Sequence, residues 1–217
     1  APNLTETVFA LGQGHRVQAV GDYDDFPPEI LALPRAGGYL DPDLERITLL
    51  NPSLLILPGR HPQVAEYAAL RRLPVLNVDM DSLASIEAGI LTLGEALEAK
   101  ASATELIAHM RAESERLREA VAGKARPRVF IVTSRQARDM NQLYTCGGDA
   151  FISEVVQLAG GENIYAAAGQ RYFEASKENV VMRAPEVILE FHAGAPLDDS
   201  DREQLLADWS AFPTLPA

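Results

Sequence analysis

The sequence predicts an α/β protein in which two small lobes with mainly parallel sheets are joined by a single long helix. Short apolar runs alternate with helical patterns in both halves of the chain, which is typical of parallel sheets covered by helices. One uninterrupted helical pattern separates the halves. The 217 residues suffice for one large domain or two small ones. We expect an N-terminal lobe over residues 1–98, a bridging helix over 99–123 and a C-terminal lobe over 124–217.

The bridging helix is centred on residues 101–121, which contain neither Gly nor Pro. Its apolar side chains recur close to the helical period, whereas most other positions are charged. A narrow apolar stripe suits a helix that lies across a surface or links two lobes. The alternative is an ordinary surface helix of one larger domain. The apolar positions are Leu106, Ile107, Met110, Leu117 and Val121.

Proline and capping residues divide the first lobe into short elements. Pro27 and Pro28 cannot continue a strand ladder, so the residues around them are expected to form a loop. Pro62 suits the first turn of a helix, and Asp81 or Ser82 can cap the next helix. The expected elements are helices over 3–11, 44–50, 61–73 and 82–99, and strands over 17–20, 53–57 and 74–78.

The second lobe shows the same alternation with longer polar interruptions. Pro185 should end one helix, because the residue before a proline disfavours the helical conformation. Two stretches are expected to be loops, and the last residues complete no element, so this lobe is expected to be incomplete at its end. The expected strands are 128–132 and 186–191, the helices 150–159, 176–184 and 198–209, the loops 133–148 and 162–175, and the trailing segment 212–217.

Composition excludes some classes of function. The net charge of -12 argues against nucleic-acid binding, which needs a basic face. Cys146 is the only cysteine, so no intramolecular disulfide can form, and we expect a small buried thiol there. No run is long and apolar enough to span a membrane. Because no signal peptide is present, we expect a cytosolic chain or the mature form of an exported one.

Two segments, one in each lobe, follow the same pattern. Each has a glutamate, a short apolar helix, a proline and then a buried strand, and Glu45 precedes Pro52 by the same interval as Glu178 precedes Pro185. The proline explains the end of each helix. It does not explain the glutamates, which either share a function or simply favour the positive end of the helix dipole.

The order of four motifs resembles the solute-binding proteins of ABC importers for cobalamin, haem and ferric siderophores. The motifs are APNLTETVFALGQGHRVQAVGDYDDFPPE, GGYLDPDLERITLLNPSLLI, GGDAFISEVVQLAGGENIY and FEASKENVVMRAPEVIL. They span nearly the whole chain, and the similarity is greatest to the cobalamin-binding member. Relative to that family, the first strand and the last strand and helix are missing from this sequence. The resemblance implies two α/β lobes joined by one long helix.

The resemblance also implies a function without catalysis. Such a protein captures a metal chelate in the cleft between its lobes and delivers it to the permease subunits of an ABC importer. We therefore expect a periplasmic or lipid-anchored extracytoplasmic monomer without a catalytic cofactor, whose ligand is cobalamin or an iron complex. The family's two docking glutamates, which meet arginines of the permease, match Glu45 and Glu178. Pairing of exposed carboxylates with arginine suits a reversible contact.

Aromatic positions of the family's pocket match Tyr23, Tyr39 and Tyr172, and Phe173 lies beside the last of these. Flat aromatic faces suit a corrin or porphyrin macrocycle. Pro58 stands where the cobalamin-binding member has a further aromatic residue. The alternative is that Tyr23 and Tyr39 pack against their own loops.

A second group of residues lies in loops that directly follow strands or precede the GGD motif. Cations there could hold a propionate, a phosphate or an anionic siderophore, although such residues are often only solvated. One of them, His61, could ligate a metal, but it has no partner at ligand spacing. The group consists of Arg60, His61, Arg135, Arg138 and Tyr144.

Two other classes of protein compete with the binding protein. A chelatase-like enzyme acting on a tetrapyrrole would need a positioned acid or base, typically a histidine with a carboxylate, and no paired-histidine constellation occurs. GxSxG, GxGxxG and P-loop motifs are also absent. The third class is a cytosolic interaction module, which an export signal upstream would exclude.

Overall fold

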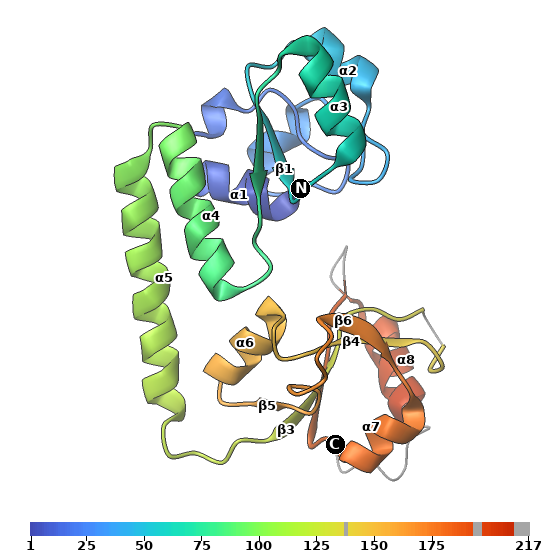
Figure 1. Ribbon diagram of the computed structural model, residues 1–217. Coiled ribbons are helices and arrows are strands. Elements are labelled where there is room, and N and C mark those ends of the chain that lie inside the picture. The colour runs from blue at the N-terminus through green and yellow to red at the C-terminus, as the bar shows by residue number, and fades with distance from the viewer. Residues whose placement is uncertain (137–138, 193–196, 211–217) are drawn as a thin grey trace. The chain divides into compact units, whose positions relative to one another are not determined.

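The computed structural model describes residues 1–136, 139–192 and 197–210 (Figure 1). Backbone contacts divide the chain into two compact units, Ala1–Ala112 and Glu113–Ala217. Each unit is a mixed α/β structure, so the predicted fold class with mainly parallel sheets is confirmed.

The first unit contains one parallel pair of strands surrounded by helices (Figure 1). β1 and β2 pair in register from Leu55↔Val75 to Pro58↔Val78. The elements in chain order are α1 (Pro2–Ala10), η1 (Gly14–Arg16), η2 (Pro28–Ala32), α2 (Leu44–Leu50), β1 (Leu55–Pro58), α3 (Pro62–Arg71), β2 (Val75–Val78) and α4 (Leu83–Ala96), followed by the start of α5 (Lys100–Val121).

The core of the first unit joins α1, β2, α4 and the beginning of α5. Buried side chains from these elements include Leu4, Val78, Ile90, Leu93 and Ile107. Burying such aliphatic side chains stabilises the fold by about 1.5–3 kcal/mol each. The α1–α4–α5 packing therefore holds the parallel strands in place.

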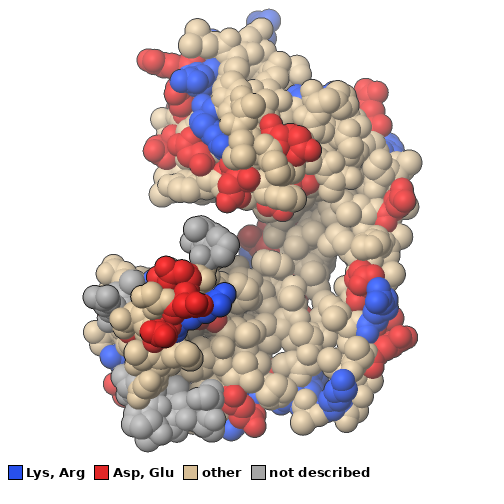
Figure 2. Space-filling view, turned by 180° about the vertical axis from the view of Figure 1, so that it is seen from behind, with Lys and Arg blue, Asp and Glu red and all other residues tan. Residues whose placement is uncertain are grey.

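Helix α5 (Lys100–Val121) is continuous, as the uninterrupted pattern predicted. The boundary between the two units falls inside it, after Ala112. Its outer face carries both signs of charge, as Figure 2 shows, and two of the pairs are Arg116–Glu113 and Arg118–Glu115. The predicted limits of the lobes stay a prediction. None of the described helices is both long and apolar enough to cross a bilayer.

The second unit has a parallel sheet of order β5-β3-β7 and an antiparallel ribbon of β4 and β6. Phe130 and Val132 of the central strand β3 are fully buried, which places the core on this strand. The elements are β3 (Arg128–Val132), β4 (Leu143–Cys146), α6 (Phe151–Leu158), β5 (Glu162–Asn163), β6 (Tyr172–Ala175), α7 (Lys177–Arg183), β7 (Val187–Glu190) and α8 (Asp199–Ser210).

Three expected elements need correction, and a fourth lies outside the described residues. Residues 17–20 form only a single bridge, between Val20 and Arg35, because the neighbouring Pro34 has no N–H to extend the ladder. The two stretches expected to be loops contain β4 and β6. Their ribbon has polar residues on one face, so its sequence resembles a loop. The trailing segment 212–217 lies outside the described residues.

Candidate ligand-binding site

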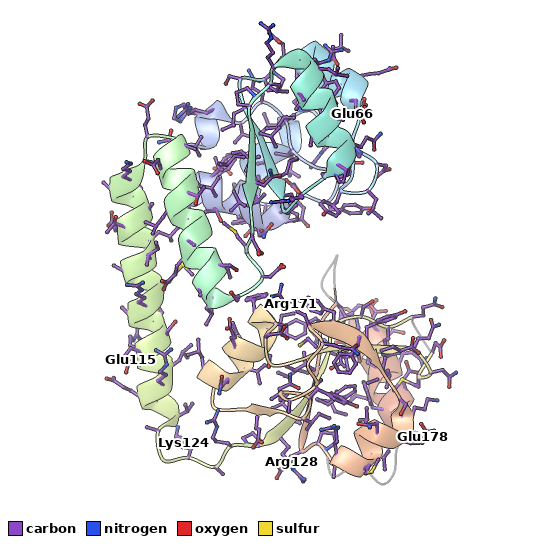
Figure 3. All side chains as sticks on the ribbon, viewed as in Figure 1. Glu66, Glu115, Lys124, Arg128, Arg171 and Glu178 are labelled. Atoms are coloured by element: carbon purple, nitrogen blue, oxygen red, sulfur yellow. The ribbon has the colours of Figure 1, made fainter. Side chains whose placement is uncertain are left out.

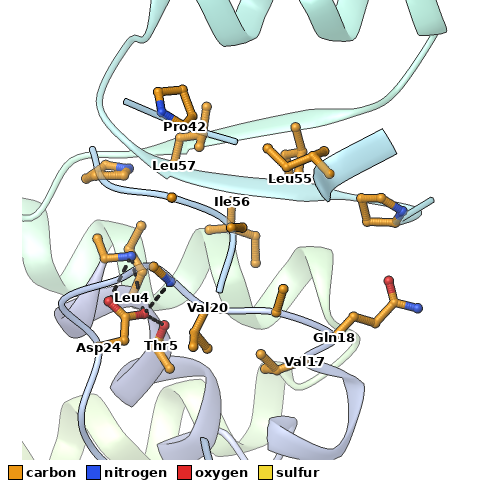
Figure 4. A pocket seen from close by; sticks show the side chains of 18 of the residues that line it. Leu4, Thr5, Val17, Gln18, Val20, Asp24, Pro42, Leu55, Ile56 and Leu57 are labelled. Carbon is orange, nitrogen blue, oxygen red and sulfur yellow. Dashed lines mark hydrogen bonds and ion pairs between the residues drawn. The ribbon is translucent and has the colours of Figure 1, made fainter. Parts of the chain in front are cut away.

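A cavity of about 360 Å³ lies within the first unit. Figure 4 shows one wall formed by Leu55, Ile56 and Leu57 of β1, and the opposite side lined by Leu4 and Val20. The lining is predominantly apolar, and its volume is at the lower end of the usual range for small-molecule sites. A complete corrin or porphyrin is too large to be enclosed there, so the rim of the cavity matters most for such a ligand.

Two of the predicted tyrosines lie together at this cavity. Tyr23 and Tyr39 both line it, and their side chains are 76% and 51% exposed. Their loops are adjacent: the ring of Tyr23 lies so near Gly38 that a Cβ atom added to this glycine would be 3.5 Å from Cε2 of Tyr23. The neighbouring Gly37 has a φ of +88°, which favours glycine at this turn. The structure thus presents two exposed aromatic rings on adjacent loops.

The loop that carries Tyr23 is held by a buried carboxylate that the sequence analysis did not single out. Asp24 is almost fully buried, and its Oδ2 accepts a hydrogen bond from Thr5 Oγ1 at 2.5 Å and one from the Gly21 N–H at 3.3 Å. The guanidinium of Arg35 donates to the Gly21 carbonyl at 2.9 Å and to the Asp24 carbonyl. The two acidic residues after Tyr23 were the available signal, but only the fold shows which one is buried.

His61 links the Tyr39 loop to α3. Its Nδ1 accepts from the Val64 N–H at 3.3 Å and caps the helix, so the other ring nitrogen carries the proton and donates to the Tyr39 carbonyl at 2.8 Å. The rings of Tyr39 and His61 also meet edge-on at 5.7 Å. Both nitrogens are therefore engaged within the unit, and no cluster of three metal-ligating side chains occurs among the described residues. Arg60, which directly precedes His61 in the loop between β1 and α3, is exposed.

In the second unit, Tyr144 and Tyr172 share one face of the β4–β6 ribbon. The register pairs Tyr144 with Glu174 and Cys146 with Tyr172, and alternate residues of a strand face the same side. Both tyrosines are exposed. Phe173 faces the opposite side, where its ring meets that of Tyr165 at 5.3 Å. The structure therefore gives Phe173 a packing role, and its predicted ligand contact stays a prediction.

Arg135 is likewise used inside its unit. Its side chain is 2% exposed, its Nε lies 2.7 Å from Glu190 Oε1, and its Nη1 lies 2.9 Å from Asp208 Oδ2. Trp209 Nε1 donates to the other Glu190 oxygen at 2.8 Å. This buried network joins β7 to α8, and the predicted ligand contact of Arg135 stays a prediction. Arg138 lies outside the described residues.

The two glutamates predicted to dock are exposed in the first turns of α2 and α7. Figure 3 shows Glu178 projecting from α7 away from the strands of its unit. Among the described residues, neither Glu45 nor Glu178 takes part in an ion pair, whereas Glu186, just after Pro185, pairs with Arg128 at 3.5 Å. Both carboxylates are thus available to a partner.

Cys146 is the buried thiol that the sequence suggested. Burial raises the pKa of this thiol to about 11, because the thiolate would lose its hydration. At neutral pH it stays protonated and is a poor nucleophile.

The model of a periplasmic binding protein family matches residues 1–195. The chain belongs to the periplasmic binding protein family. The vitamin B12-binding protein of Pectobacterium carotovorum is 30% identical over 193 residues, covering 87% of this chain and 68% of that protein. The one from Yersinia pestis is 30% identical over 192 residues, covering 87% of this chain and 66% of that protein.

Solved periplasmic binding proteins share the fold. The vitamin B12-binding protein BtuF of Vibrio cholerae has a TM-score of 0.77 at 28% identity, covering all of this chain and 81% of its own. The heme-binding protein RhuT of a Roseiflexus species has a TM-score of 0.77 at 27% identity, covering 89% of this chain and 74% of its own. The heme-binding protein HutB of Vibrio cholerae reaches 0.84 at 18% identity, covering all of this chain and 83% of its own. The periplasmic binding protein family thus includes relatives named for two kinds of macrocycle. This chain spans about two thirds of the length of the vitamin B12-binding proteins of Pectobacterium carotovorum and Yersinia pestis.

Proposed function

We propose that this chain is an extracytoplasmic solute-binding protein that captures a metal-bearing macrocycle or chelate and delivers it to an ABC importer. The observation that carries the proposal is the pair of exposed rings, Tyr23 and Tyr39, on adjacent loops at the rim of an apolar cavity. Such rings present flat apolar area with a polar end, as a macrocycle with polar side groups requires. Tyr144 and Tyr172 provide a second exposed aromatic face on the other unit.

Cobalamin or a related corrinoid is the ligand we favour. The relatives at 30% identity are named for vitamin B12. Haem and ferric siderophores come next, since a relative at 27% identity is named for heme. No group of three or more metal-ligating side chains occurs among the described residues, so we expect the protein to recognise the ring system and its side groups, with the metal held mainly by the ligand itself.

Absorption spectroscopy tests the ligand. The protein should be titrated with cyanocobalamin, haemin and a ferric siderophore, and complexes isolated by gel filtration. We expect co-elution of cyanocobalamin with its corrin band at the position of the protein. A Soret band in place of the corrin band would move the assignment to haem. Failure of the folded protein to retain any of the three would overturn the capture of a metal-bearing ligand.

Delivery is proposed to depend on Glu45 and Glu178. Both are exposed carboxylates that arginines of a permease can pair with. In Glu45→Arg and Glu178→Arg, a like charge would face those arginines, and we expect uptake to fall while ligand affinity stays unchanged. Losing one partner of a desolvated charge pair costs about 2–5 kcal/mol, and a reversal should cost at least as much. Normal uptake by the double variant would contradict the docking role.

A further inference from the structure

Helices α2 and α7 are built alike, although they belong to different units. Each has seven residues. Each begins at a side-chain cap, since Asp43 accepts from the Arg46 N–H and Ser176 accepts from the Asn179 N–H. The docking glutamate is therefore the second helical residue in both, in the first turn of an α-helix.

The two helices also end in the same way. Their final residues are followed by Asn51 at a φ of 46° and Ala184 at a φ of 44°, each in the left-handed region and directly before a proline. Each helix turns one side chain into its own unit: Ile47 and Val180 are buried. The opposite side of each helix faces solvent within its unit.

A large apolar side chain follows each docking glutamate by one helical turn. Leu49 is 82% exposed and Met182 is 75% exposed. Residues at i and i+4 lie on the same face of a helix, so each apolar side chain stands beside its glutamate. One exposed leucine is ordinary on a protein surface. An exposed apolar residue at the same position of two matching helices indicates a shared use.

We propose that Glu45 with Leu49, and Glu178 with Met182, form two equivalent docking patches, each of which inserts an apolar side chain beside its charged contact. The inference rests on the proposed delivery to a permease and specifies the surface that performs it. Each patch fits a permease site that offers an arginine next to an apolar socket. Covering the apolar contact excludes water from the neighbouring ion pair and strengthens it.

The chain provides matched controls. Leu70 on α3 is 82% exposed and follows the exposed Glu66 by four residues, and Leu206 on α8 is 72% exposed and follows Glu203 by three, so each resembles a patch residue of its own unit but lies outside α2 and α7. Leu49→Ser, Met182→Ser, Leu70→Ser and Leu206→Ser should be compared with Glu45→Gln and Glu178→Gln. Binding of each full-length variant to the source organism's importer in lipid nanodiscs, ligand affinity and melting temperature should be measured at several salt concentrations.

We expect Leu49→Ser and Met182→Ser each to weaken importer binding about tenfold, mainly through faster dissociation, with ligand affinity and melting temperature unchanged. Their salt dependence should match that of the wild type, whereas Glu45→Gln and Glu178→Gln should reduce it. The controls should change binding by less than about twofold. If the glutamate variants bind weakly but the apolar variants behave like the controls, the inference fails and the proposed delivery stands. If neither set has an effect, the proposed docking fails as well.

Discussion

Arg135 and Glu190 form a buried ion pair, with Nε 2.7 Å from Oε1, at the place where β7 meets α8. The carboxylate of Asp208 approaches the same guanidinium at 2.9 Å. The guanidinium is paired with two carboxylates of its own unit, which stabilises the contact between β7 and α8. Its charge is therefore largely neutralised and attracts an external anion only weakly. This relationship predicts that Arg135 supports the fold of its unit.

Replacing Arg135 should therefore affect stability more than binding. Arg135→Met leaves Glu190 and Asp208 buried without their cation, and loss of one partner of a buried pair costs about 3–5 kcal/mol. Chemical denaturation followed by Trp209 fluorescence measures this loss. Arg202→Met is the control, because its pair with Asp199 is exposed and should contribute less than about 1 kcal/mol. Unchanged stability with lost affinity for an anionic ligand would return Arg135 to the binding site.

Tyr39 should contribute directly to ligand binding. We expect Tyr39→Ala to weaken the affinity by about 1–3 kcal/mol, the usual loss when an aromatic side chain is removed from a pocket. Tyr39→Phe keeps the ring and should lose less affinity than Tyr39→Ala. Leu70→Ala, at an exposed position on α3, should bind the ligand as tightly as the wild type. Calorimetric titration with the ligand found by spectroscopy measures all three. Equal affinities of wild type and Tyr39→Ala would remove Tyr39 from the site.

Tyr172 gives the corresponding prediction for the second unit. Tyr172→Ala should weaken binding by about 1–3 kcal/mol, because its exposed ring lies on the same face of the ribbon as Tyr144. Phe173→Ala should instead lower the melting temperature, since that ring packs on Tyr165. Thermal melts and titrations on both variants separate the two roles. If Tyr172→Ala lowered the melting temperature and Phe173→Ala weakened binding instead, the strand register would be contradicted.

Cys146 should resist alkylation while the protein is folded. Its pKa of about 11 keeps the thiolate fraction at pH 8 more than about a hundredfold below that of an ordinary thiol. Labelling with iodoacetamide should be slow in buffer, accelerate as the pH rises toward 11, and become fast in denaturant. Ser200→Cys adds a thiol at an exposed position of α8 and should react without denaturant. Equally fast labelling of Cys146 in buffer would mean that this region opens readily.

The contact between Glu87 of α4 and Arg111 of α5 predicts a pH dependence. Arg111 Nε lies 2.9 Å from Oε1 and Nη2 lies 2.5 Å from Oε2, and these hydrogen bonds lower the pKa of Glu87. The stabilisation is therefore present above the unfolded pKa of about 4.3 and is lost as the pH falls through the lower folded value. Glu87→Gln should lower the denaturation midpoint slightly at pH 7 and leave it unchanged near pH 2. Glu113→Gln, which breaks a pair within α5 alone, is the control.

The sequence allowed the local features to be predicted because they depend on neighbouring residues. The helix Lys100–Val121 and the matching helices with Glu45 and Glu178 follow from periodicity, caps and prolines. Features that depend on distant contacts were not predictable in this way. The burial of Arg135 needs partners from β7 and α8, and the opposite directions of Tyr172 and Phe173 follow only once β6 is known to pair with β4.

The hydrogen bonds of Asp24 and Arg35 that fix the Tyr23 loop affect how fast a ligand can bind. Because these contacts exist in the unliganded chain, the backbone of the loop has already lost its freedom on folding. Ligand association then carries a small entropy loss from loop ordering, which leaves more of the contact energy for affinity. The proposed ligand would then be bound at close to the encounter rate, with no slow closure of the Tyr23 loop.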